Sequence, residues 1–101
     1  MIKPLSINEF NNAINQKTTL VAFTAPWCPP CRALKPLLEE FAEDNASGAN
    51  FYNVNIDDES ALTRENGVMS VPTVLVFKNG IQTARGNGPF TKEKLTSLIN
   101  S

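Results

Sequence analysis

The chain has 101 residues, a formal net charge of −1, 19% charged residues and 42% hydrophobic residues. This composition is typical of one globular domain, residues 1–101, and excludes the basic surface expected of a protein that binds nucleic acid or an anionic membrane. Two cysteines without a histidine are too few for a structural zinc site, which takes four ligands. No run resembles a targeting segment or a membrane span, so we expect a cytoplasmic location.

Two elements are predicted before the cysteines. Ser6 followed by Glu9 is typical of a capping box, and Leu5 with Phe10 of a hydrophobic staple. A helix of roughly two turns is expected to follow Ser6. The apolar run "TTLVAFTA" is rich in β-favouring residues and predicts a buried strand over about 20–24, covered on both faces.

After the cysteines, apolar residues recur at spacings of three and four: Leu34, Leu37, Leu38, Phe41 and Ala42. This period predicts an amphipathic helix that begins at the cysteines and runs to about Asn45. Pro36 lies inside it and predicts a kink, since proline removes a backbone donor and clashes with the preceding turn.

The second half of the chain alternates strands and helices. "NFYNVNI" predicts a strand with Val54 and Ile56 on one face and Phe51 on the other. A short helix over about 60–65 is expected to end at Asn66 and Gly67.

"VPTVLVFKNGIQTARG" predicts two antiparallel strands joined by the tight turn Asn79-Gly80. Thr91 predicts the N-cap of a C-terminal helix. The first two strands are most simply parallel, through a right-handed helical crossover. Together these elements predict an α/β protein with a central mixed sheet flanked by helices on both faces, although the strand order stays open.

The stretch "WCPPC" carries the clearest chemical signal, because it holds both cysteines two residues apart. Thiol–disulfide exchange needs an exposed, partly ionised thiol and a second thiol that attacks the mixed disulfide. Cys28 is expected at the helix N-cap, where the helix dipole favours thiolate, and Cys31 one turn further in. We therefore interpret Cys28 as the nucleophile and Cys31 as the resolving thiol. A purely structural bond is the weaker reading, since closing so small a loop restricts the unfolded chain little.

The neighbours of the cysteines have expected roles in tuning and recognition. Pro29 suits the first helical position and should alter the thiol pKa and the reduction potential. Pro30 removes a donor, which leaves the N–H of Cys31 as the nearest backbone partner of the Cys28 sulfur. Trp27 is expected at the rim, where an amphipathic ring can cover the thiols and contact a partner.

These motifs resemble the thioredoxin family over nearly the whole chain. "WCPPC" is similar to the family's WCGPC, "VPTVLVFKNG" is similar to its segment from a cis-proline to the hairpin turn, and Pro36 matches its helix kink. The resemblance implies a thioredoxin fold and a protein-disulfide reductase with a redox-active Cys28-Cys31 disulfide/dithiol and no bound cofactor. It further implies protein disulfide substrates, a flavin- and NADPH-dependent thioredoxin reductase as electron source, and a monomer.

The resemblance also assigns a substrate groove. It implies that Pro72 is cis and faces the sulfurs, that Val71 offers backbone hydrogen bonds to an extended substrate, and that Gly88 and Pro89 complete the groove. Such a groove recognises extended chain through main-chain bonds and modest apolar contact.

The chain departs from the family pattern at two positions. Family members usually carry a buried aspartate six residues before the first cysteine and a lysine on the next strand, where this chain has Ala22 and Asn53. Losing both is coherent, because a lone buried ammonium would be strongly unfavourable. The hypothesis is a slower reaction in which Cys31 loses its proton to water or to the leaving sulfur.

Two alternatives stay open at this point. The same fold can act as a thiol oxidant or disulfide isomerase in an oxidising compartment. A non-catalytic binding module could instead use the groove around Pro72 as a docking surface, although the presence of both cysteines counts against it.

Overall fold

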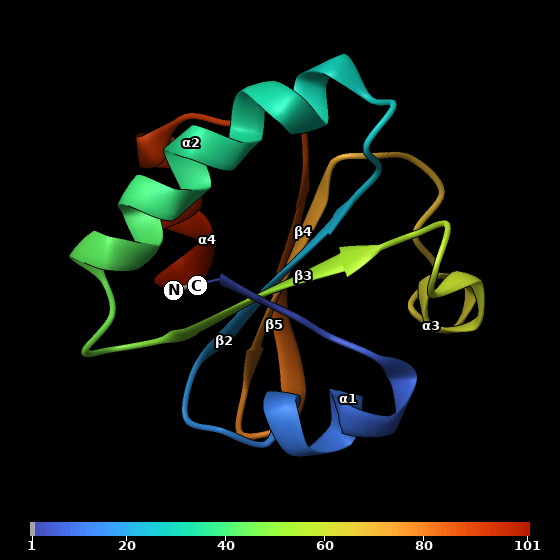
Figure 1. Cartoon of the computed structure of the whole chain (residues 1–101). Coiled ribbons are helices and arrows are strands. Elements are labelled where there is room, and N and C mark those ends of the chain that lie inside the picture. Colours follow the sequence, from blue (N-terminus) through green and yellow to red (C-terminus); the bar gives the residue numbers. More distant parts are fainter. Residues whose placement is uncertain (1) are drawn as a thin grey trace.

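The computed structural model describes residues 2–101 and shows a five-stranded sheet with helices on both faces (Figure 1). Its elements in chain order are β1 (Ile2–Pro4), α1 (Ile7–Ile14), β2 (Thr19–Thr24), α2 (Pro29–Asp44), β3 (Asn50–Asn55), α3 (Ser60–Glu65), β4 (Thr73–Lys78), β5 (Ile81–Asn87) and α4 (Lys92–Ile99).

The strands lie in the order β1-β3-β2-β4-β5. Strands β1, β3 and β2 run parallel, β4 is antiparallel to β2, and β5 is antiparallel to β4. The predicted parallel pair and the predicted hairpin are therefore confirmed, and the sheet is mixed. The hairpin turn has positive φ at Asn79 (53°) and Gly80 (88°), as the dipeptide predicts.

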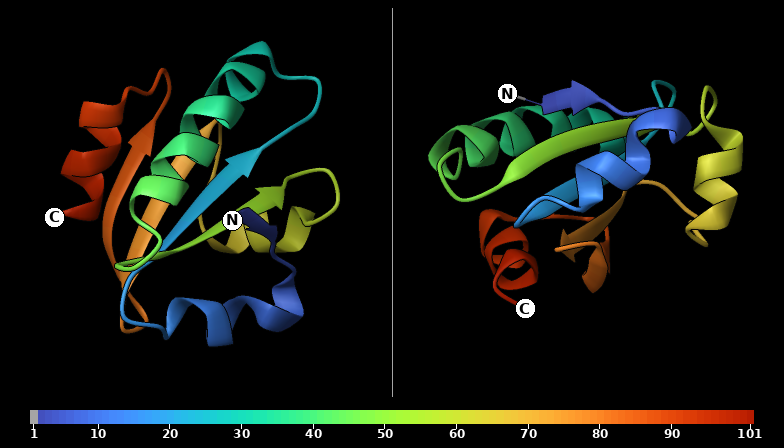
Figure 2. Two further views of the ribbon diagram at one scale, coloured as in Figure 1. Left: turned by 60° about the vertical axis from the view of Figure 1, so that its left-hand side comes forward. Right: turned by 90° about the horizontal axis from the view of Figure 1, so that it is seen from below.

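Each face of the sheet has its own apolar layer. On one face α2 and α4 pack on the sheet, with a core of Leu20, Ala22, Leu34, Leu38, Phe41, Ala42, Phe51, Val74, Val76 and Leu95. On the other face α1 and α3 pack, with a core of Leu5, Ala13, Ile14, Val21, Phe23, Val54, Leu62, Leu75 and Phe77. In both views of Figure 2, α3 and α4 lie on opposite sides of the molecule. Successive residues of β2 alternate between the two layers, so the expected burial of this strand on both faces is confirmed.

Strand β1 was not expected from the sequence. It has three residues, ends in Pro4, and pairs with β3 at the edge of the sheet. A strand of three residues is too short to show alternation of apolar and polar residues. Its proline is tolerated at the edge of a sheet, but in the sequence it suggests that no strand is present. Its position brings Ile2 and Pro4 beside β3.

The predicted capping box at the start of α1 is wrong in its hydrogen bonds. Ser6 is the N-cap with extended dihedrals, but its hydroxyl donates to Glu9 Oε1 at 3.1 Å and caps no backbone N–H. The amide of Ile7 donates instead to Glu59 Oε1 at 3.0 Å. A carboxylate 52 residues away therefore takes part of the capping role.

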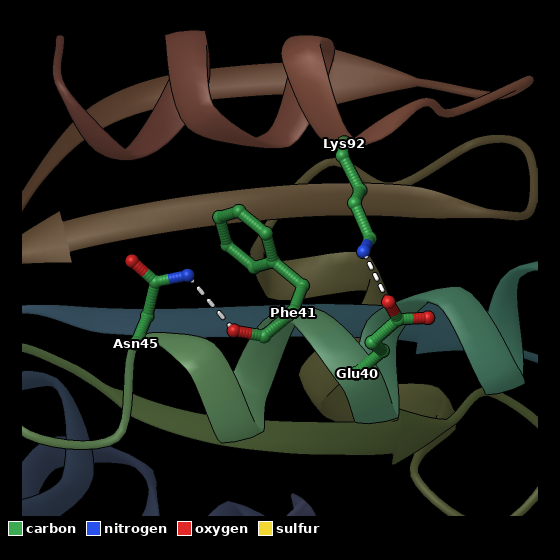
Figure 3. A network of polar contacts seen from close by, with 4 residues as sticks. All are labelled: Glu40, Phe41, Asn45 and Lys92. Atoms are coloured by element: carbon green, nitrogen blue, oxygen red, sulfur yellow. Dashed lines mark hydrogen bonds and ion pairs between the residues drawn. The ribbon is translucent and has the colours of Figure 1, made fainter.

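The N-cap of α4 and the end of α2 are closed locally. Thr91 Oγ1 accepts from the amide of Lys94 at 3.1 Å, as predicted. Figure 3 shows Asn45 Nδ2 donating to the Phe41 carbonyl at 2.8 Å, near the end of α2.

An ion pair of Lys92 with Glu40 links α4 to α2, as Figure 3 also shows. The hydrogen bond to Glu40 raises the pKa of Lys92 above its usual 10.5. The kink expected at Pro36 stays a prediction.

Candidate active site

The two cysteines lie where the chain leaves β2 and enters α2. Cys28 is the N-cap of α2 with extended dihedrals, and its amide donates to the Ala25 carbonyl at 3.2 Å. Pro29 and Pro30 occupy the first two helical positions, where their missing N–H groups remove no intrahelical bond. The predicted places of Cys28 and Pro29 on the helix are confirmed.

Cys28 and Cys31 form a disulfide with their Cα atoms 5.2 Å apart. The backbone N–H of Cys31 donates to Cys28 Sγ at 3.3 Å, which is the partner that the two prolines predict. The expectation of an exposed Cys28 is wrong in this oxidised state, because Cys28 is 4% exposed and Cys31 is 5% exposed. The cause is tertiary packing, since Val71 and Ile56 pack against the pair.

Trp27 lies at the rim of the site, as expected. Its side chain is 61% exposed, and its Nε1 donates to Asp57 Oδ2 at 2.9 Å. The bond fixes one edge of the indole to the segment after β3 and leaves the rest of the ring open to a partner.

The Val71–Pro72 peptide bond is cis, as the resemblance implies. The Val71 carbonyl oxygen lies 3.8 Å from Cys28 Sγ. The amide of Gly88 donates to the Pro72 carbonyl at 3.1 Å, and a Cβ on Gly88 would lie 2.8 Å from Pro72 Cγ. Glycine is therefore required at position 88 by the close approach of the Pro72 ring.

A groove of about 350 Å³ runs beside the rim. It is lined by Trp27, Ile56, Thr63, Val68, Met69, Ser70 and Val71. The structure thus brings Trp27 and Val71 into one groove, whereas Pro72 is buried and neither it nor Gly88 is among the lining residues. The sequence reading missed Met69, which is 97% exposed. The only signal that could have found it is its place two residues before Val71.

Ala22 and Asn53 lie side by side, as partners in the register of β2 and β3. Ala22 is fully buried, while Asn53 is half-buried and its Oδ1 accepts from Thr24 Oγ1 at 2.7 Å. Asn53 and Thr24 line a second, larger cleft of about 680 Å³, and Cys31 lines the same cleft. We call this space the Cys31 cleft.

Within residues 2–101, no three histidine, cysteine, aspartate or glutamate side chains are arranged to hold a metal ion. No helix in the described part of the chain combines the length and apolar character needed to cross a membrane.

A disulfide-forming Cys-Pro-Pro-Cys pair at a strand-to-helix junction, beside a cis-proline on a mixed sheet, defines a thiol–disulfide oxidoreductase. Comparison with known proteins agrees. The family model for thioredoxin matches residues 1–101. A thioredoxin of Chlamydia caviae is 40% identical, over 99% of this chain and 97% of that protein.

Solved structures give the same result. The oxidised thioredoxin of Plasmodium falciparum superposes with a TM-score of 0.86 at 30% identity, covering 99% of this chain and 96% of that one. The thioredoxin of Malassezia sympodialis gives a TM-score of 0.90 at 27% identity, covering 99% and 89%. The chain belongs to the thioredoxin family. It is a protein-disulfide reductase that works through its redox-active Cys28-Cys31 pair and needs no cofactor of its own.

Proposed function

We propose that Cys28 is the attacking thiol and Cys31 the resolving thiol in the reduction of protein disulfides. The observation that carries this assignment is the N–H of Cys31, which points to Cys28 Sγ at 3.3 Å from the first turn of α2. A backbone donor and the positive end of the helix dipole both favour the thiolate form at Cys28. The thiolate is the nucleophile in thiol–disulfide exchange.

The reaction then takes two sulfur displacements. The Cys28 thiolate attacks one sulfur of the substrate disulfide, which forms a mixed disulfide and releases the first substrate thiolate. Cys31 loses its proton and attacks Cys28 Sγ, so that the mixed disulfide breaks and the second substrate thiolate leaves. Two electrons pass to the substrate, and the chain ends as the Cys28-Cys31 disulfide of this structure.

The substrate segment is proposed to bind in extended form along Val71. Support comes from the Val71 carbonyl, 3.8 Å from Cys28 Sγ, and from the neighbouring groove that Trp27 and Met69 line. Pro72 and Gly88 act behind Val71 by fixing its backbone through their mutual contact. Main-chain pairing with modest apolar contact accepts many sequences.

Electrons for the next cycle are proposed to come from a flavin- and NADPH-dependent thioredoxin reductase. Family membership supports this partner, and the chain has no glycine-rich nucleotide fingerprint of its own. A dithiol reductant works where thiols are kept reduced, which supports a cytoplasmic location. We propose that residues 1–101 act as one domain and as a monomer.

Trapping tests the two roles. The Cys31→Ser variant keeps the attacking thiol and lacks the resolving one, so incubation with insulin should accumulate a mixed disulfide through Cys28 that dithiothreitol releases. The matched Cys28→Ser variant should trap little. Mass spectrometry of the conjugates identifies the linked cysteine. Preferential trapping by Cys28→Ser would reverse the two roles, and equal trapping would show that neither cysteine is the preferred nucleophile.

A further inference from the structure

The Cys31 cleft opens beside the resolving cysteine and differs from the groove at Trp27 and Val71. Its walls come from β1, β2, β3, α2 and the segment between β2 and α2, and its polar lining residues include Thr24, Cys31, Arg32, Lys35, Glu39 and Asn53. A volume of about 680 Å³ is large enough to hold several water molecules. Cys31, which is 5% exposed, lines this cleft and does not line the groove at Trp27 and Val71.

The charged side chains that line the cleft all lie on α2, namely Arg32, Lys35 and Glu39. Glu39 is eight residues beyond Cys31, which is about 12 Å along a helix axis and outside hydrogen-bond reach. Asp57 does not line this cleft; its carboxylate lies beside Trp27 and accepts the hydrogen bond of the indole N–H. No carboxylate among the described lining residues is therefore placed to take the proton of Cys31.

The side of the cleft formed by β2 and β3 carries polar side chains that cannot act as a base, Thr24 and Asn53 among them. Ala22 and Asn53 replace the family's aspartate and lysine, and Asn53 is hydrogen-bonded to Thr24 at 2.7 Å. A threonine hydroxyl and a carboxamide hydrogen-bond water or an oxyanion without taking a proton at neutral pH.

On the α2 side of the cleft there are two cationic side chains, Arg32 and Lys35, and one carboxylate, Glu39, and Arg32 also donates to the Pro26 carbonyl at 2.9 Å. This excess of one positive charge favours a small anion over a cation.

We propose that the Cys31 cleft admits small oxyanion bases of the hydrogen phosphate type, and that such a base removes the proton of the resolving thiol. This inference rests on the proposed role of Cys31. The base binds the thiol proton as its conjugate acid, and the Cys31 thiolate attacks Cys28 Sγ. The Cys28–substrate sulfur bond breaks, the Cys28–Cys31 bond forms, and the second substrate thiolate leaves with the electron pair of the broken bond.

The step can be isolated with reduced protein and a limiting amount of the chromogenic disulfide dithiobis(nitrobenzoate) in a stopped-flow instrument. The first coloured thiolate reports attack by Cys28, and the second reports attack by Cys31. Because nitrobenzoate thiolate is a good leaving group, sulfur attack is fast and proton removal limits the second release. At fixed pH and ionic strength, the second rate should rise linearly with hydrogen phosphate, by roughly tenfold over the accessible range.

The size of the base separates the cleft from bulk solvent. The bulky oxyanion phenylphosphonate, which has a similar basicity, should give a slope several-fold smaller than hydrogen phosphate. Thr24→Trp, which places an indole in the cleft, should lower the phosphate slope, and the matched control Thr96→Trp on the exposed side of α4 should not. Should Thr24→Trp fail to fold, the comparison of the two bases on the unaltered chain decides the question.

Each outcome has one meaning. A second release that is independent of phosphate, or equally steep with phenylphosphonate, overturns the cleft proposal and leaves the roles of Cys28 and Cys31 intact. A first release with no second release in any buffer overturns the role proposed for Cys31 itself. A slope that depends on base size and is lowered by Thr24→Trp supports the proposal.

Discussion

The contact between Gly88 and Pro72 can be tested by adding one methyl group. In Gly88→Ala the new Cβ would lie 2.8 Å from Pro72 Cγ and 3.1 Å from Pro72 Cδ. The first distance is roughly 0.7 Å shorter than the closest favourable carbon–carbon contact of about 3.5 Å. A proline ring cannot rotate away, so the backbone must move, and overpacking of this kind costs about 1–3 kcal/mol.

Two other glycines provide graded controls. A Cβ on Gly86 would lie 3.0 Å from Leu98 Cδ1, the end of a flexible side chain that can shift. A Cβ on Gly48 would meet nothing closer than the Asn45 carbonyl oxygen at 4.0 Å. We expect Gly86→Ala to destabilise the fold less than Gly88→Ala, and Gly48→Ala to stay within about 0.5 kcal/mol of the parent.

Urea unfolding followed by Trp27 fluorescence gives the three free energies, and insulin reduction gives the functional effect. Movement of Pro72 displaces the Val71 carbonyl, which lies 3.8 Å from Cys28 Sγ. Gly88→Ala should therefore weaken insulin reduction under conditions where the variant is fully folded. If Gly88→Ala were as stable and as active as Gly48→Ala, the rigid contact with Pro72 would have no structural role.

Two further predictions concern the cores and the surface. Leu62 of α3 is 1% exposed, so Leu62→Ala should lower the free energy of unfolding by about 2–5 kcal/mol in urea titrations, and a loss below about 1 kcal/mol would contradict the packing described for α3. The pKa of Lys92 is raised by its hydrogen bond to Glu40, so this ion pair stabilises the fold below pH 10.5 and its contribution is lost as the pH rises through the raised pKa. The difference in urea midpoint between the parent and Lys92→Met should accordingly close above that pH, and a difference that persists would assign the effect to the packing of the side-chain stem.

The parts of the fold that were predictable are those with local signals. Residues around Leu38 repeat at helical spacing, Asn79-Gly80 fits a tight turn, and the prolines after Cys28 mark the first turn of a helix. Each of these signals acts over a few residues, and each appears in the structure where it was expected.

The missed features depend on distant partners. Strand β1 exists because β3 offers it an edge, and Glu59 caps α1 from 52 residues away. Met69 becomes part of a groove only when Trp27 is brought beside it. The burial of Cys28 likewise comes from Ile56 and Val71, which approach from other segments.

The Cys31 cleft could be suspected but not located from the sequence. The absence of the aspartate and lysine at Ala22 and Asn53 was visible. Whether the space closes or stays open depends on how far α2 stands from β1 and β3, and no short pattern encodes that separation.

Strand β2 is hydrogen-bonded to β3 on one side and to β4 on the other. Each inner amide of β2 donates to only one of these neighbours, but both neighbours are themselves paired to a further strand, so we expect exchange of these amides to require opening of the interior of the sheet. The Cys28-Cys31 pair that follows Thr24 is attached to the central strand of the sheet. The bond between Cys28 and Cys31 can therefore form and break next to a strand that stays hydrogen-bonded on both sides.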